Sequence, residues 1–362
     1  MYNFQIDKNF LDKYEWNLQQ IFLYVNDECQ LRCKHCLVKP NLDFKFKREF
    51  DLEKLKKLLS DFKKMWAVKL TILWWEPTLY SKLTDLIEYS KDLWFQFITI
   101  DTNWLFDSKL LDNSSFKKLD DISFSIDWYN NKTHWFLRWN WVLLKTLNNL
   151  KQAIEKWYNV SVTTCIHRGL IDFNETEPEL RYKDLKETIL FLEKLWIYSL
   201  NFHVLLPHWM PISTWSEGTD ISIDEWMKIK LFLLKIKNKL KIDIRIPTHF
   251  INKNEYKNNK EYYDFCTLKI SERVLLTVDW LIRNCAGFLG SKYHVARFED
   301  NKITWNYDEN TNEYSWLNSK CKWCPYQFKD KNIWELVPLC FSLKPNQKEF
   351  IWVNKLKWDL KK

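Results

Sequence analysis

The sequence predicts an α/β protein built on a parallel sheet, followed by a small cysteine-rich α+β domain. Apolar strand patterns alternate with amphipathic helical patterns from about residue 21 to about residue 206. This alternation is typical of parallel sheets, in which a helix connects each strand to the next. Beyond this region the pattern changes, and five of the nine cysteines lie after residue 260. We therefore expect a core domain, a bridging helical segment and a cysteine-rich domain, over 1–215, 216–260 and 261–362.

Local patterns define the individual elements. Six short apolar segments are expected to be strands, at 21–25, 69–73, 96–100, 122–126, 159–165 and 198–205. Leucines at 52, 55, 58 and 59 predict an amphipathic helix from Asp51 to about Lys64. Further along the chain we expect a lysine-rich helix over 223–240 and a hairpin with strands over 273–278 and 281–283.

Length and composition limit the class of protein. A chain of 362 residues with 46% hydrophobic content can bury one large domain and a smaller one. No run of about 18 apolar residues occurs and the N-terminus is polar, which favours a cytoplasmic protein with no membrane partner. The net charge of +8 is spread among alternating acids and lysines, so nucleic acid is not an expected partner. Nine cysteines in a cytosolic chain indicate metal or redox chemistry.

The most informative motif is a triplet of cysteines, Cys29-x3-Cys33-x2-Cys36, directly after the first expected strand. Soft thiolates select iron–sulfur clusters or zinc. Three thiolates can hold three irons of a [4Fe–4S] cluster and leave the fourth iron open. Structural zinc needs a fourth ligand, which His35 could supply, so zinc stays open on this fragment alone. A disulfide is disfavoured because no signal peptide precedes the motif.

The segment Asn26–Cys36 resembles the signature of radical S-adenosylmethionine (SAM, AdoMet) enzymes, which often read N-x-x-C-N-L-x-C-x-H-C. The resemblance implies that Cys29, Cys33 and Cys36 ligate a [4Fe–4S] cluster whose open iron is chelated by AdoMet. It also implies reductive cleavage of AdoMet to a 5′-deoxyadenosyl radical, with electrons from a donor such as flavodoxin or ferredoxin. The implied fold is a partial (β/α)6 TIM-like barrel. No catalytic residue is assigned beyond the cluster.

Four later segments resemble further motifs of the same family, in the family's order and at the ends of expected strands. Trp74-Trp75-Glu76-Pro77 stands where family members carry G-G-E-P, and Asn103-Trp104 stands where they carry N-G. Ser125-Ile126-Asp127-Trp128 resembles S-[IL]-D-G, and His134-x3-Arg138-Trp139-Asn140-Trp141 resembles H-x-x-x-R-G-x-G. Because ligands of parallel sheets bind at the carboxyl ends of the strands, these segments are expected to surround the cofactor.

The resemblance assigns roles to these residues. The turn with Glu76 would orient the methionyl amino group, Ser125 and Asp127 would bind ribose oxygens, and Arg138 would pair with the AdoMet carboxylate. Judged from the residues alone, Ser125 and Asp127 describe a strand-end turn and Arg138 a surface cation, so the ordered set of motifs carries the assignments. The candidate AdoMet-binding residues are Trp74, Trp75, Glu76, Asn103, Ser125, Asp127 and Arg138.

Composition is unusual in one respect, because the chain has 22 Trp and only 4 Gly, whereas glycine is normally about 7% of residues. The motif tryptophans stand at family glycines. Trp94, Trp157 and Trp196 each lie between a helix end and a strand, where a left-handed backbone favours glycine. We expect most of these codons to be UGA, read naturally as glycine and here as tryptophan. The alternative is a genuine aromatic residue, which we expect at Trp226 inside a helix.

Recoding would have a physical consequence at the cofactor site. An indole at a turn with positive φ is strained, and at Trp74 and Trp75 we expect it to take space that AdoMet needs. UGG codons at these two positions and at Trp128 and Trp280 would exclude the recoding.

The C-terminal cysteines indicate a second iron–sulfur site. Cys266-x13-Trp280-x4-Cys285 resembles the C-x9–15-G-x4-C element of SPASM and twitch domains, and Cys321-x2-Cys324 resembles their downstream C-x-x-C. The resemblance implies one auxiliary [4Fe–4S] cluster held by four of five cysteines. Which four stays open: the favoured set is Cys266, Cys285, Cys321 and Cys324, and the alternative includes Cys340. Zinc on the same cysteines is the remaining alternative.

Relatives with such C-terminal domains often modify peptides or proteins, so a peptide or protein is the expected substrate. A small-molecule substrate is the alternative within the family. A non-catalytic iron–sulfur or zinc protein on a degenerate barrel is the alternative outside it. Cys165, at the end of the fifth expected strand, is predicted to be a buried structural thiol. His203 and His208 either line the substrate mouth or pack at the rim.

Overall fold

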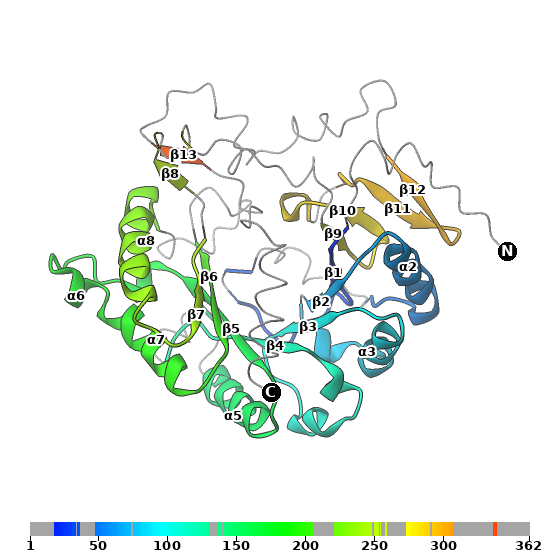
Figure 1. The fold of residues 1–362 in the computed structure, drawn as a ribbon, viewed down its shortest axis with the longest axis horizontal. Coiled ribbons are helices and arrows are strands. Elements are labelled where there is room, and N and C mark those ends of the chain that lie inside the picture. The colour runs from blue at the N-terminus through cyan, green and yellow to red at the C-terminus, as the bar shows by residue number, and fades with distance from the viewer. Residues whose placement is uncertain are drawn as a thin grey trace.

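The protein folds around a sheet of eleven strands. The structure is a computed structural model. It describes residues 18–33, 35–36, 48–73, 75–129, 137–138, 141–205, 221–247, 250–252, 254, 258, 273–289, 292–306 and 336–338. Seven strands run parallel in sequence order (Figure 1). They are β1 (Gln20–Tyr24), β2 (Lys69–Leu73), β3 (Phe97–Thr102), β4 (Asp121–Ser125), β5 (Val160–Ile166), β6 (Ser199–Val204) and β7 (Asp243–Arg245). The six expected strands are confirmed within two residues, and β7 is additional.

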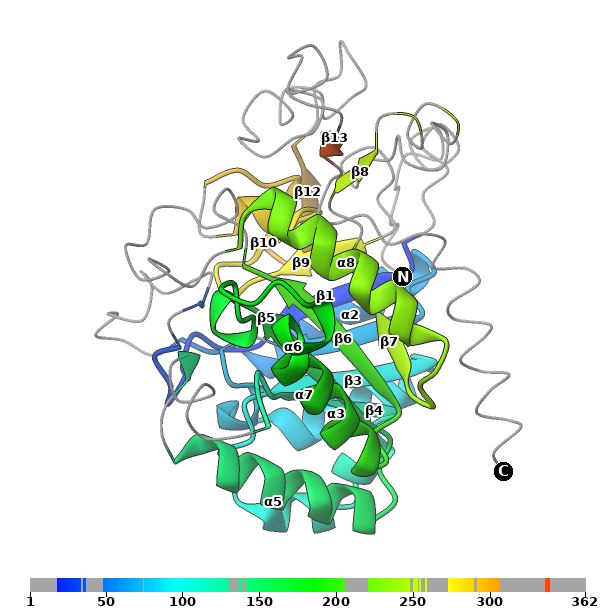
Figure 2. The same ribbon diagram turned by 90° about the vertical axis from the view of Figure 1, so that its left-hand side faces the viewer.

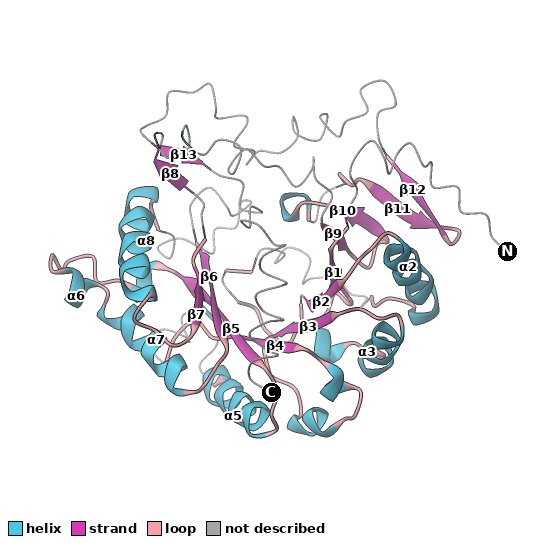
Figure 3. Ribbon diagram, in the orientation of Figure 1, coloured by secondary structure: helices cyan, strands magenta, loops and turns pink. Residues whose placement is uncertain are grey.

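Helices line the outer side of the curved sheet (Figures 1 and 3). They are α2 (Leu52–Lys64), α3 (Leu83–Asp92), α5 (Val142–Glu155), α6 (Pro178–Arg181), α7 (Lys183–Lys194) and α8 (Ile223–Lys237). The predicted helix after the cysteine loop begins at Asp51, whose carboxylate accepts a hydrogen bond from the Lys54 amide at 2.7 Å. In the part of the chain that the structure describes, no helix combines the length and apolarity that crossing a membrane requires.

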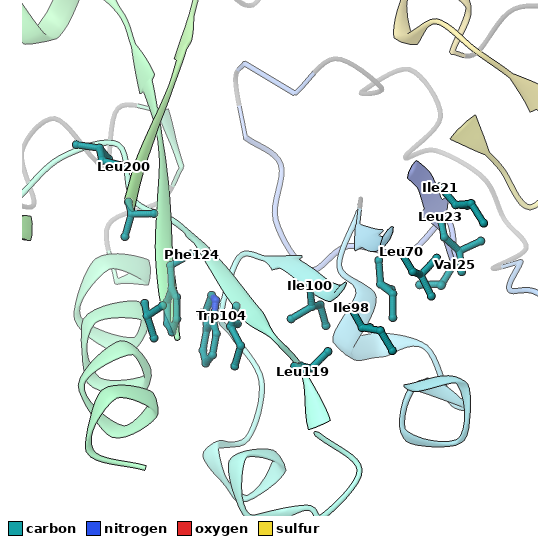
Figure 4. Packing of buried hydrophobic residues seen from close by; sticks show 14 of the residues in the cluster. Ile21, Leu23, Val25, Leu70, Ile98, Ile100, Trp104, Leu119, Phe124 and Leu200 are labelled. Atoms are coloured by element: carbon teal, nitrogen blue, oxygen red, sulfur yellow. The ribbon is translucent and has the colours of Figure 1, made fainter. Parts of the chain in front are cut away.

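The core lies between the sheet and these helices, and strand alternation explains its composition. In the parallel strands, alternate residues face the helices, and most of these are apolar and buried, among them Ile21, Leu23, Leu70, Ile98 and Ile100 (Figure 4). Burying one such side chain contributes roughly 1.5–3 kcal/mol to the free energy of unfolding, so the buried set stabilises the fold.

The opposite, concave face of the sheet is polar near its centre. Side chains on β1, β2 and β3 form a ladder of hydrogen bonds. Gln20 Nε2 donates diagonally to Thr71 Oγ1 at 2.9 Å, and Thr99 Oγ1, the in-register neighbour of Thr71, donates to the same atom at 3.0 Å. Ser123 and Thr163 pair similarly on β4 and β5 at 3.2 Å. A closed TIM barrel fills this space with branched apolar side chains. The polar lining therefore distinguishes this sheet from a fully packed barrel.

The sheet continues beyond β1 into the C-terminal region. The expected hairpin is confirmed as β9 (Arg273–Leu276) and β10 (Leu281–Arg283), and β9 pairs in parallel with β1 (Figure 2). Two antiparallel strands follow, β11 (Ala296–Glu299) and β12 (Lys302–Trp305). The sheet thus crosses the boundary expected at residue 261. A separate pair joins β8 (Phe250–Asn252) to β13 (Leu336–Pro338).

Tryptophan occupies left-handed backbone at seven positions. Apart from Asp300 and Asn301, every non-glycine residue with positive φ in the described ranges is a tryptophan: Trp66, Trp75, Trp94, Trp104, Trp157, Trp196 and Trp280. An L-residue with a Cβ is disfavoured there by steric contact with the backbone, and the effect is costly for a bulky side chain. Trp128 and Trp226 are fully buried and are not in this set.

Four of these residues terminate helices in the manner of glycine. Trp66, Trp94, Trp157 and Trp196 follow the last residues of α2, α3, α5 and α7, with φ of 69°, 62°, 65° and 61°. The amides of Trp94 and Phe95 donate to Lys91 O and Ser90 O, the two bonds of a Schellman motif. The same pair of bonds ends α2 and α5. The left-handed backbone predicted for Trp94, Trp157 and Trp196 is confirmed, and Trp66 is a fourth case that the sequence pattern missed.

Candidate functional site

The loop after β1 carries the cysteine triplet and is tied to the end of β2. The Asn26 side-chain amide donates to Glu76 O at 2.9 Å, and the Glu76 amide donates to Glu28 O at 2.9 Å. Cys29, Cys33 and Cys36 lie on this loop as thiols outside any disulfide, and the Cys36 amide donates to Cys33 O at 3.1 Å. Leu31, Leu105 and Val142 form an apolar floor against Cys29 and Cys33.

The cysteine loop supplies three soft sulfur donors, which iron–sulfur clusters and zinc both select. Among the residues that the structure describes, no group of three or more metal-binding side chains is arranged to hold a single ion. Burial raises the pKa of Cys29 to about 12 and that of Cys33 to about 11. The thiols are therefore neutral until a metal displaces their protons.

An ion pair at the end of β4 faces the cysteine loop. Asp127 is fully buried, and its Oδ2 accepts a hydrogen bond from Arg138 Nε at 2.5 Å while its Oδ1 accepts one from the Cys165 amide at 2.9 Å. Arg138 Nη1 lies 4.0 Å from Cys33 Sγ, and Nη2 lies 3.3 Å from His35 Nε2. The structure thus brings two expected AdoMet ligands together as a pair. His35 Nε2 is directed at this pair.

Glu76, at the turn after β2, is fully buried and accepts hydrogen bonds from three residues. Its carboxylate accepts hydrogen bonds from Thr78 N at 3.1 Å, Thr78 Oγ1 at 2.6 Å and Thr102 Oγ1 at 2.5 Å. It also accepts one from the Asn103 amide at 2.7 Å. Burial raises the pKa of Glu76, and these hydrogen bonds oppose the rise. The carboxylate therefore holds the ends of β2 and β3 together, while the backbone of the same residue anchors the cysteine loop.

The remaining predicted residues are distributed around this edge or lie outside the described ranges. Trp75 follows β2 with φ of 26°, and Ser125 ends β4 in a half-buried position. Cys165 is buried, as predicted, and burial raises its pKa. His203 is exposed on β6, and Cys285 is a buried thiol after β10 that is in no disulfide. Outside the described residues lie Trp74, His208, Cys266, Cys321, Cys324 and Cys340.

The sequence did not single out His167, which follows β5 with extended backbone and continues the inward alternation of Cys165. It is fully buried, and its Nδ1 accepts a hydrogen bond from the Gly169 amide at 3.2 Å. In the neutral ring the proton is therefore on Nε2, which is buried without a partner in the described structure. Counting alternate residues past the end of β5 would have found it.

His167 gives the protein a predictable response to acid. Burial lowers the pKa of His167 to about 4, below the ordinary value near 6.5, so the unfolded chain takes up the proton first. Stability that is present above pH 6.5 is then lost as the pH falls toward 4. We expect the free energy of unfolding to drop by about 2 kcal/mol more between pH 7.5 and pH 5 in the parent than in His167→Gln.

Urea unfolding of the cluster-free protein at the two pH values measures this difference. Asp127, the charged group that acts on His167, is present in both proteins, so its own contribution to the acid response cancels in the comparison. An equal acid response in parent and variant would contradict the prediction.

A parallel α/β sheet with ligating groups at the carboxyl ends of its strands is the architecture of a cofactor-binding enzyme. Residues 23–180, which make up less than half of the chain, match the Radical SAM superfamily. Domains of this class bind a [4Fe–4S] cluster and AdoMet, and the thiols of the β1 loop fit that cluster.

Known proteins of this class resemble the chain to a limited extent. The GTP 3′,8-cyclase of Limosilactobacillus fermentum is 26% identical over 129 residues, which cover 35% of this chain and 39% of that protein. The GTP 3′,8-cyclase of Synechocystis sp. is 20% identical over 167 residues, covering 46% and 51%. The chain thus spans about two fifths to one half of the curated relatives that it matches.

Solved structures share the fold over more of the chain. Streptococcus suis SuiB bound to S-adenosylmethionine has a TM-score of 0.59 at 14% identity, covering 82% of this chain and 65% of that one. The protein anSMEcpe with bound AdoMet has a TM-score of 0.62 at 14% identity, covering 89% and 94%. At this level of identity the likeness concerns the fold.

Proposed function

We propose that the protein is a radical SAM enzyme that modifies a peptide or protein. The observation that carries the proposal is the triplet of cysteine thiols beside Glu76, Asn103 and Asp127, all at the carboxyl edge of the parallel sheet. The cluster and AdoMet, when bound, supply a one-electron cleavage that leads to hydrogen abstraction from the substrate. A donor such as flavodoxin or ferredoxin would provide the electron in the cytoplasm.

The chain's own residues would hold and orient the reacting groups. Cys29, Cys33 and Cys36 would bind three irons, and the guanidinium of Arg138, 4.0 Å from Cys33 Sγ, would place positive charge beside a thiolate. Glu76 would fix the turns around the methionyl group. Ser125 and Asp127, alternate residues of one strand end, would face the ribose. Trp74 and Trp75 would occupy the turn nearest to AdoMet.

A peptide substrate is supported by two relatives of similar fold. SuiB has been solved with the precursor peptide SuiA, at a TM-score of 0.58 covering 78% of this chain. The protein anSMEcpe has been solved with AdoMet and a peptide, at a TM-score of 0.58 covering 89%. We also propose a SPASM- or twitch-like C-terminal domain with one auxiliary [4Fe–4S] cluster, of whose five candidate ligands Cys285 is described. Small-molecule chemistry is the second candidate, favoured by the sequence matches to GTP 3′,8-cyclases.

We further propose that the left-handed tryptophans are glycines in the natural protein, encoded by UGA. Seven positive φ values support this, and so does the packing of Trp104. Its ring stacks on Phe124 with centroids 3.4 Å apart, closer than the usual 4.5–7 Å, and its Nε1 is buried without a partner in the described structure (Figure 4). Overpacking of this kind destabilises a core. The codons at these positions test the proposal directly.

The function is tested with a chain carrying glycine at the seven left-handed positions and at Trp74. We expect anaerobic reconstitution to load about eight irons per chain, four for each cluster, and reduction to release 5′-deoxyadenosine from AdoMet. Cys33→Ser in the same background is the control and should lose about four irons and all cleavage. Bound zinc without cleavage would contradict the proposal. Product formation is then compared with two substrates, a precursor peptide encoded beside the gene and GTP. This comparison distinguishes a peptide substrate from a small-molecule substrate.

A further inference from the structure

Cys29 has two hydrogen-bond donors directed at its sulfur. The Leu31 amide lies 3.3 Å from Cys29 Sγ, and Asn103 Nδ2 lies 3.5 Å from it. The first donor belongs to the cysteine loop itself. The second comes from the end of β3 and is separated from Cys29 by 74 positions in sequence. Sulfur accepts hydrogen bonds at longer distances than oxygen, so both contacts are within bonding range.

The orientation of the Asn103 amide is fixed by its other partner. Asn103 Oδ1 accepts a hydrogen bond from the Leu105 amide at 3.1 Å. A backbone N–H can only donate, so the oxygen must face Leu105 and the NH2 group must face Cys29 and Gln30 Oε1, the latter at 3.1 Å. The assignment of nitrogen and oxygen therefore follows from the hydrogen bonds themselves.

The backbone of Asn103 is held equally firmly. Its amide donates to Glu76 Oε2 at 2.7 Å, and its carbonyl accepts a hydrogen bond from Thr146 Oγ1 at 3.2 Å. Both the backbone and the side chain of Asn103 are thus engaged, and the residue is buried. Because Glu76 also binds the cysteine loop through its own backbone amide, one residue sets the separation of the donor from the sulfur.

We propose that Asn103 raises the reduction potential of the cluster held by Cys29, through an N–H···S hydrogen bond that Glu76 keeps in place. This rests on the proposed cluster at the cysteine triplet. Reduction adds negative charge, and part of it is carried by the thiolate sulfurs. A donor directed at a sulfur stabilises the reduced state more than the oxidised state, which shifts the potential upward. Glu76 is a positioning residue in this scheme, because it acts through Asn103.

The test is a redox titration of the cluster-loaded full chain without AdoMet, followed by electron paramagnetic resonance. Asn103→Leu keeps the approximate volume and removes the donor, so we expect a more negative midpoint potential at unchanged iron content. Glu76→Gln should give a smaller shift in the same direction, because it weakens the hold on Asn103. Gln30→Leu is the matched control, since it removes the second acceptor of the same NH2 group and should leave the potential unchanged.

Two outcomes would overturn the inference: equal potentials for Asn103→Leu and the parent, or an equal shift in Gln30→Leu. If Asn103→Leu does not fold, Asn103→Asp retains the shape and replaces the donor by an acceptor, and it should lower the potential further. The potential is read without AdoMet or substrate. Failure of AdoMet cleavage would therefore contradict the proposed function and leave this inference standing, whereas unchanged potentials in proteins that cleave AdoMet would contradict the inference alone.

Discussion

Replacing Trp94, Trp157 and Trp196 together by glycine is expected to raise the free energy of unfolding by about 2 kcal/mol. Left-handed backbone costs an L-residue roughly 1–2 kcal/mol, and the greater freedom of glycine in the unfolded chain returns about half of this. The three indoles are 82%, 93% and 85% exposed, so their removal sacrifices little buried surface. Urea unfolding of the cluster-free chain measures the change.

Two controls isolate the backbone effect. Alanine at the same three positions keeps a Cβ in the left-handed region, so it should recover little of the gain. Trp141→Gly changes a tryptophan that is also exposed but has φ of −93°, and it should not stabilise the protein. A loss of stability in the glycine triple variant would contradict the reading of these positions as helix-terminating glycines.

Asp127→Ala is expected to lower the free energy of unfolding by about 3–5 kcal/mol, because it leaves the guanidinium of Arg138 without its carboxylate in a largely buried site. The side chains of the pair are 0% and 10% exposed, and the Cys165 amide loses its acceptor as well. Glu179→Ala breaks an exposed ion pair with Lys186 and should change the stability far less. Chemical unfolding of both variants gives the comparison.

A double variant shows whether the buried charge is the cause. Asp127→Ala combined with Arg138→Leu removes both charges, so it should lose less stability than the sum of the single changes. Strict additivity would attribute the loss to packing around Asp127 and would argue against the ion pair as a stabilising unit.

Local sequence patterns were sufficient to predict the positions of the strands and three of the left-handed tryptophans at helix ends. The apolar runs gave the first six parallel strands within two residues, since strand periodicity is recorded in neighbouring residues. The left-handed backbone of Trp94, Trp157 and Trp196 was also predictable, because a helix end is defined by a few consecutive residues. Trp66 was missed although the same signal was present, because two residues separate it from β2 just as two residues separate the other three from their strands.

Contacts between distant residues were beyond the sequence. Arg138 was expected to meet the AdoMet carboxylate, and the structure pairs it with Asp127 and directs it at Cys33 and His35. Likewise, nothing in the pattern of β9 indicates that it pairs in parallel with β1. Strand partners depend on which edge is free in the folded sheet, and a single sequence does not record that choice.

By itself, the sequence determined the α/β class and the thiol triplet that can hold a cluster. It also determined most of the helix ends at which tryptophan has the left-handed backbone typical of glycine. These are properties of short segments, fixed by periodicity, spacing and steric limits on φ. The tertiary structure decided which groups act together: Glu76 on Asn103, Asn103 on Cys29, and Asp127 on Arg138. The physical reason is that hydrogen bonds and ion pairs act over a few ångströms, and only the register of the sheet brings residues from separate strand ends within that distance.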